Sequence, residues 1–98
     1  MSTYLIRQMP RLSVVFTTLA GADVDPDNVS CTVRHPNGKK VVYTYGTDME
    51  LIKDDIGRYH IDLLLDSAKL WYIFWEASGT YFGAGDHSLE VRSSPALD

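Results

Sequence analysis

Apolar and polar residues alternate along most of the chain, which is the pattern of β-strands with one buried face. The clearest example runs from Gly57 to Gly79, where two alternating runs are separated by the turn-compatible residues 66–69. The apolar side of the first run carries Tyr59, Ile61, Leu63 and Leu65, and that of the second carries Trp71, Ile73 and Trp75. Because a large aromatic side chain can bury about 150–250 Å², we expect the two tryptophans to centre the core.

The same alternation predicts further short strands on both sides of this segment. They cover residues 3–6, 11–18, 29–34, 40–45, 51–53 and 87–92. Asn37-Gly38 joins two of these runs, and this dipeptide is a strong hairpin signal because both residues tolerate a positive φ angle. No segment shows a sustained period of 3.6 residues, so no helix of ordinary length is predicted.

About seven short strands, with a turn about every 8–12 residues, are typical of a β-sandwich. The order of the strands fits an all-β fold, the immunoglobulin-like antiparallel β-sandwich. We expect one sheet to hold the strands near Tyr4, Val14 and Ile61. We expect the other sheet to hold the strands near Cys31, Tyr43, Trp71 to Trp75, and Leu89.

Length and charge narrow the domain organisation and the class of partner. The 98 residues are expected to form a single immunoglobulin-like domain, 1–98, with a frayed tail from residue 93. A net charge of −4 argues against nonspecific binding to nucleic acid and against docking on an anionic membrane. The single Cys31 forms no internal disulfide, which fits assembly in a reducing cytosol. No apolar run reaches the length of a signal peptide or a transmembrane segment.

An acidic loop resembles the start of a calcium site. Asp23, Asp25 and Asp27 have the spacing of the first calcium ligands, but Asn28 and Arg34 stand where that loop requires Gly and Glu. We therefore interpret these aspartates as a solvated acidic loop, and no metal site is predicted.

The histidines and the cysteine predict no reactive site either. His35, His60 and His87 are too dispersed for structural zinc, which takes about four close nitrogen or sulfur ligands. His60 falls opposite the apolar side of its strand, so we expect it to point to solvent. Cys31 is in phase with apolar neighbours and is expected to be a small core residue. A triad of Ser67, His60 and Asp66 can be written on paper, but no nucleophile elbow supports it. The sequence therefore predicts no catalytic residues and no cofactor.

Two pairs of aromatic residues are candidates for a partner interface. If the tryptophans face the core, Tyr72 and Phe74 face out of the sheet, flanked by the outward Thr32 and Arg34 of a neighbouring strand. The second pair is Tyr81-Phe82, in a Gly-rich loop. The alternatives are ordinary scattered exposure for the first pair, and rings folded back to cap the sandwich for the second.

Five ordered segments carry a resemblance to a known family. They are Arg11 to Thr17, Val33 to Gly38, Tyr43 to Tyr45, Gly57 to His60, and the run from Trp71 to Glu76 with its second Trp at 75. Together they resemble the small immunoglobulin-like proteins encoded among the virion genes of tailed bacteriophages, from about Ile6 to Arg92. Relatives usually carry a Gly near Lys69 and polar residues near Tyr72 and Phe74, where this chain differs.

This resemblance implies a non-enzymatic structural or accessory protein of the virion, at the head–tail (neck) region or decorating the head. Its partners would be other virion proteins (portal, connector, capsid or tail) or copies of itself, and it would be made and assembled in the host cytoplasm. One alternative is a carbohydrate- or cell-surface-binding β-sandwich module, which an exposed Trp beside paired carboxylates would favour. The other is an enzyme, for which the sequence offers no convergent polar set.

Overall fold

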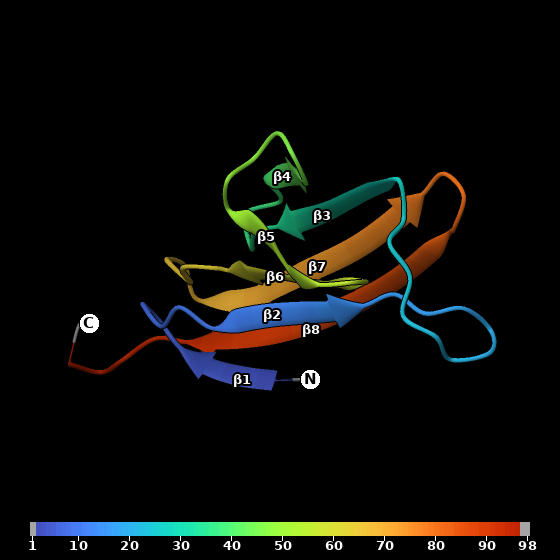
Figure 1. Ribbon diagram of the computed structural model, residues 1–98. Coiled ribbons are helices and arrows are strands. Elements are labelled where there is room, and N and C mark those ends of the chain that lie inside the picture. The colour runs from blue at the N-terminus through green and yellow to red at the C-terminus, as the bar shows by residue number, and fades with distance from the viewer. Residues whose placement is uncertain (1, 97–98) are drawn as a thin grey trace.

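The computed structural model describes residues 2–96, which form strands in two layers and no helix (Figure 1). The strands of the larger sheet, in spatial order, are β1 (Ser2–Leu5), β8 (Gly83–Arg92), β7 (Lys69–Ser78), β3 (Asn28–Arg34) and β4 (Lys40–Thr44). Those of the smaller sheet are β2 (Arg11–Val15), β6 (Arg58–Asp62) and β5 (Leu51–Asp55). This is the arrangement of an immunoglobulin-like sandwich with an added strand beside β3, so the predicted fold class is confirmed.

The placement of β1 corrects the expected composition of the sheets. We expected the strand near Tyr4 to share a sheet with those near Val14 and Ile61, but β1 pairs in parallel with β8, with Tyr4 opposite Val91. Residues 6–10 then carry the chain across to β2 in the smaller sheet, and Arg7 turns this segment with a φ of 75°. Alternation along a strand is the same in either sheet, so the sequence pattern did not distinguish them.

The core lies between the two sheets and is built from the predicted apolar sides of the strands. Trp71 and Trp75 are fully buried, and Cys31 lies opposite Trp75 on the neighbouring strand β3. From the smaller sheet, Tyr59 packs edge-on against Phe16, with ring centroids 6.0 Å apart. Alternation therefore predicted the inner faces of both layers correctly.

Strand β8 begins earlier than the sequence pattern indicated. Residues 83–86 were expected to be a Gly-rich loop, but Gly83 pairs with Ala77 and Asp86 pairs with Phe74 of β7. Glycine lowers β propensity, yet the long partner strand supplies a continuous ladder of hydrogen bonds. This extension lengthens the outer face of the larger sheet along β7. The strand ends at Arg92, and residues 97–98 of the expected tail lie outside the described residues.

Candidate functional site

Tyr72 and Phe74 lie on the solvent side of β7, as the alternation of this strand predicts. Their exposed fractions are 48% and 42%, whereas Trp71, Ile73 and Trp75 on the other side are at most 1% exposed. Because β7 is the third of five strands in its sheet, the two rings stand in the middle of the face that points away from the core. We call this outward side of the larger sheet the aromatic face.

Strand β3 supplies one flank of the aromatic face. Arg34 is paired with Tyr72, and Thr32 is paired with Phe74, so both polar residues lie beside the rings as expected. Arg34 is exposed and Thr32 is half-buried. The structure thus brings together four of the six residues proposed as a partner interface.

Strand β8 supplies the other flank, which sequence reasoning missed. Ser88 is paired with Tyr72, and Asp86 is paired with Phe74. A shallow hollow of about 300 Å³ lies between the flanks, lined by residues of β3, β7 and β8. Asp86 was missed because it lay in the expected loop, and only its pairing with Phe74 places it on this face.

Charge is distributed unevenly across the aromatic face. Arg34 of β3 and Lys40, its partner on β4, place two positive charges on one side of β7. Asp86 and Glu90 of β8 place two negative charges on the other side, where Glu90 is paired with Leu70. Two further charged residues lie on this face: Glu76 follows Phe74 on the outward side of β7, and Arg92 follows Glu90 on the outward side of β8. All six charged residues are exposed, and none forms an ion pair with another residue in the range 2–96.

Tyr81 and Phe82 do not join this group. They follow the end of β7 and precede Gly83, so they lie at the tip of the β7–β8 hairpin (Figure 1). Phe82 is 82% exposed, and Tyr81 is 42% exposed, so the rings do not fold back to cap the sandwich completely. A smaller hollow of about 200 Å³ separates them from Phe16 and Pro26. The tip is therefore a second apolar surface, distinct from the aromatic face.

The three aspartates of the acidic loop bond to three different elements. Asp23 forms an ion pair with Arg58 at 3.3 Å. Asp27 accepts hydrogen bonds from the N–H and the hydroxyl of Thr80, at 2.8 and 3.0 Å. Because each carboxylate has its own protein partner, the three do not converge on one point. The loop is therefore attached to neighbouring segments by its aspartates, and it is not the solvated loop that we expected.

Asp25 holds the loop against the turn between β5 and β6. One oxygen accepts from the Lys53 ammonium at 2.9 Å, and the other accepts from the Gly57 N–H at 2.8 Å. The bond from Lys53, and after it the bond from Gly57, holds the pKa of Asp25 below its ordinary value. Glycine is required at 57 because φ is 71° and a Cβ atom would lie 2.6 Å from the carbonyl oxygens of Phe16 and Val24.

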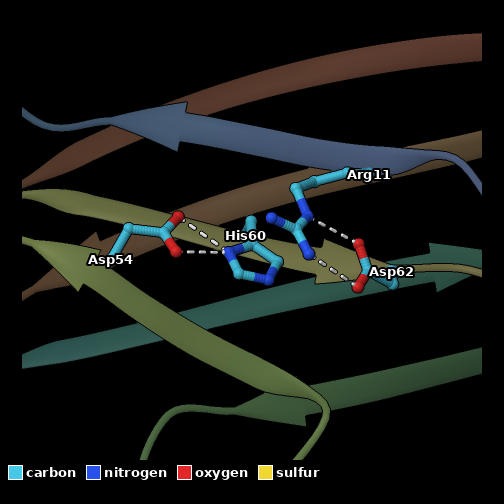
Figure 2. Close-up of polar contacts among 4 residues, drawn as sticks. All are labelled: Arg11, Asp54, His60 and Asp62. Atoms are coloured by element: carbon cyan, nitrogen blue, oxygen red, sulfur yellow. Dashed lines mark hydrogen bonds and ion pairs between the residues drawn. The ribbon is translucent and has the colours of Figure 1, made fainter.

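His60 is buried, which contradicts the expectation that it points to solvent. It does lie opposite the apolar side of β6, but β6 is the central strand of its sheet. Ser13 and Ile52 are its cross-strand neighbours, and Asp54 and the Arg11–Asp62 ion pair stand at either end of the ring (Figure 2). These side chains cover the imidazole and leave it 4% exposed.

The proton on His60 is fixed by its partner. Nδ1 lies 2.7 Å from both carboxylate oxygens of Asp54, and a carboxylate only accepts, so Nδ1 donates (Figure 2). Nε2 is buried and has no hydrogen-bond partner among residues 2–96. The triad written with Ser67 and Asp66 does not form, because the carboxylate on His60 is Asp54. The carbonyl of Ser67 accepts the indole N–H of Trp71.

The remaining histidines and Cys31 do not gather into a reactive group. His35 packs on the ring of Trp71, with ring centroids 4.3 Å apart. His87 is paired with Ile73 and lies on β8, which is separated from β3 by β7. Burial raises the pKa of the Cys31 thiol to about 12, so it stays protonated at neutral pH. Within residues 2–96, no three His, Cys, Asp or Glu side chains are placed to hold a metal ion.

The comparisons with known proteins show no family for this chain. No protein-family model and no curated protein matches the sequence. Among solved structures, the V domain of an amphioxus IgVJ-C2 protein is similar, with 13% sequence identity and a TM-score of 0.42. The similarity covers 91% of this chain and 97% of that chain. The described part of this chain contains no helix long and apolar enough to cross a membrane.

Proposed function

We propose that this chain is a non-enzymatic structural protein of a tailed-bacteriophage virion that docks through its aromatic face, on another particle protein or on a copy of itself. The observation that carries the docking surface is the exposure of Tyr72 and Phe74 in the middle of a sheet, with polar side chains on both flanks. An aromatic centre with a polar rim is how the energetic centres of protein interfaces are commonly built.

The sequence resemblance supports the phage origin, and it implies a position at the neck or on the surface of the head. The residues that differ from the family pattern point to the same surface. Relatives usually carry polar residues near Tyr72 and Phe74, whereas this chain exposes two rings there. Exposed aromatic rings lower the solubility of a protein. A partner that covers them, and that is specific to this chain, is therefore the simplest reason for the two rings of Tyr72 and Phe74.

The carbohydrate-binding alternative has less support. It would be favoured by an exposed Trp beside paired carboxylates, but both tryptophans of this chain lie in the core. We therefore place the function in protein–protein docking, within a virion that is assembled in the host cytoplasm.

The test replaces both rings with residues of ordinary strand propensity. Phage particles made with Tyr72→Ser and Phe74→Thr together should lack the protein, while the purified variant keeps the β-sheet circular dichroism of the wild type. The matched control is Val15→Ser with Leu64→Thr, two residues that are 45% and 50% exposed and lie outside the aromatic face. The control should be incorporated normally.

Incorporation of the ring variant at wild-type levels would place the docking surface elsewhere, and the Tyr81–Phe82 tip would then be tested in the same way. The class of protein has an independent test. A portal, capsid or tail gene beside this gene would support the virion role, and a neighbourhood without virion genes would count against it.

A further inference from the structure

We propose that the partner on the aromatic face is a second copy of this chain, related by a two-fold axis that runs along the β7 strands of both copies. The inference rests on the proposed use of this face for docking, and it names the occupant and its orientation. It is carried by the opposite charges on the two flanks of β7, where Arg34 on one side and Asp86 and Glu90 on the other meet in this arrangement.

A face-to-face pair of identical subunits has its two-fold axis in the plane of the interface. Both copies use the same surface patch, so every contact occurs twice. With the axis along β7, the β3–β4 side of one copy lies over the β8 side of its partner. Arg34 then approaches Asp86 and Glu90 of the second copy, and Lys40, which is one strand further from β7, lies over the β1 side of that copy. With the axis across the strands, β3 would lie over β3, and like charges would meet.

The cross-strand pairing also gives the position of Arg34 in such a pair. Arg34 and Ser88 both lie in the row of Tyr72, on opposite sides of β7. Rotation about β7 therefore places Arg34 of one copy over Ser88 of the other. Asp86 and Glu90 stand two residues to either side of Ser88, so the guanidinium would lie between two carboxylates. The symmetry repeats this contact in the other half of the interface.

The centre of the face fits the same arrangement. Tyr72 and Phe74 lie on the axis, so the rings of the two copies would meet and fill the hollow beside them. Glu76 lies on the same axis and would also meet its own copy, which is one like-charge contact against the Arg34 contacts of both halves. A different partner protein would require a face complementary to that partner, with no need for opposite charges on its two sides. A self-complementary face is required only of a two-fold pair.

The orientation of the two copies can be tested by reversing the charges of Arg34, Asp86 and Glu90. Rim charges contribute more to orientation and to the exclusion of wrong pairings than to affinity. In the wild-type protein, sedimentation velocity over a concentration series should show a monomer–dimer equilibrium that weakens as salt is added. Arg34→Glu should weaken the dimer by about tenfold or more, since it repeats a like-charge contact in both halves.

The decisive measurement mixes two variants that are each monomeric. One is Arg34→Glu, and the other carries Asp86→Lys with Glu90→Lys. In a mixed pair, one half keeps the native contact and the other half has it reversed, so the 1:1 mixture should form a heterodimer. Thermal melts of both variants control for folding, because all three positions are exposed.

Three results would overturn the proposal. They are a wild-type protein that stays monomeric at every concentration, a dimer that Arg34→Glu leaves unchanged or strengthens, and a mixture that remains monomeric. If the wild type is monomeric but the Tyr72→Ser, Phe74→Thr variant is still lost from particles, the docking function stands and only the second copy is excluded as its partner.

Discussion

Trp71 and Trp75 lie on the same side of β7 and are equally buried, but only Trp71 has a hydrogen-bond acceptor for its indole. Its Nε1 donates to the carbonyl of Ser67 at 2.8 Å. Nε1 of Trp75 is buried without a partner. The two side chains therefore contribute similar apolar burial and differ in one hydrogen bond.

Truncation of either tryptophan should remove a large part of the stability of the domain. We expect Trp71→Ala and Trp75→Ala each to cost about 3–5 kcal/mol, because each leaves a cavity in the core. Chemical denaturation measures both. Midpoints equal to the wild type would contradict the burial of these residues.

Replacement by Phe separates the hydrogen bond from the burial. Trp71→Phe leaves the Ser67 carbonyl without its donor, whereas Trp75→Phe removes a donor that already lacked an acceptor. We expect Trp71→Phe to be the more destabilising of the two by about 1 kcal/mol. Equal free energies of unfolding for the two variants would show that the indole bond contributes nothing net.

The burial of His60 should destabilise the fold unless Asp54 accepts its hydrogen bond. Asp54→Ala leaves the Nδ1 donor buried and unpaired, at a cost of about 1–3 kcal/mol. Adding His60→Leu to that variant removes the unpaired donor and should recover part of the loss. A double-mutant cycle measures the coupling. Additive effects of the two changes would mean that the contact does not stabilise the fold.

The stability of the acidic loop should depend on pH through Asp25. Its pKa in the fold is held below the ordinary value of 3.8, mainly by the Lys53 hydrogen bond and then by Gly57. A lowered pKa means that the stabilisation is present above about pH 4 and is lost as pH falls through 3.8 towards the folded pKa. Asp25→Asn should therefore flatten the acid limb of the stability curve in urea titrations. An unchanged limb would contradict this assignment.

Lys69 has a conformation that suits glycine. Its φ is 93°, in a region where a side chain costs about 1–2 kcal/mol. Lys69→Gly should raise the thermal midpoint, because the relief of strain exceeds the entropy that glycine loses on folding. Lys40→Gly is the control. It stands at the start of β4 without a positive φ and should lower the midpoint.

The sequence by itself determined which side of each strand is buried. Alternation is a local property, so Trp71 and Trp75 could be assigned to the core and Tyr72 and Phe74 to the surface without knowledge of the neighbouring strands. The same reasoning predicted the sandwich, because the number and spacing of the strands allow few other folds.

Only the tertiary structure decided the neighbour of β1, the extent of β8 and the burial of His60. Pairing placed β1 beside β8, turned residues 83–86 into strand and brought Asp86 to the aromatic face. It also buried His60, since a residue on the outer side of a central strand can be covered from both flanks. These outcomes depend on contacts between residues far apart in the chain, and the periodicity of a single strand carries no information about them.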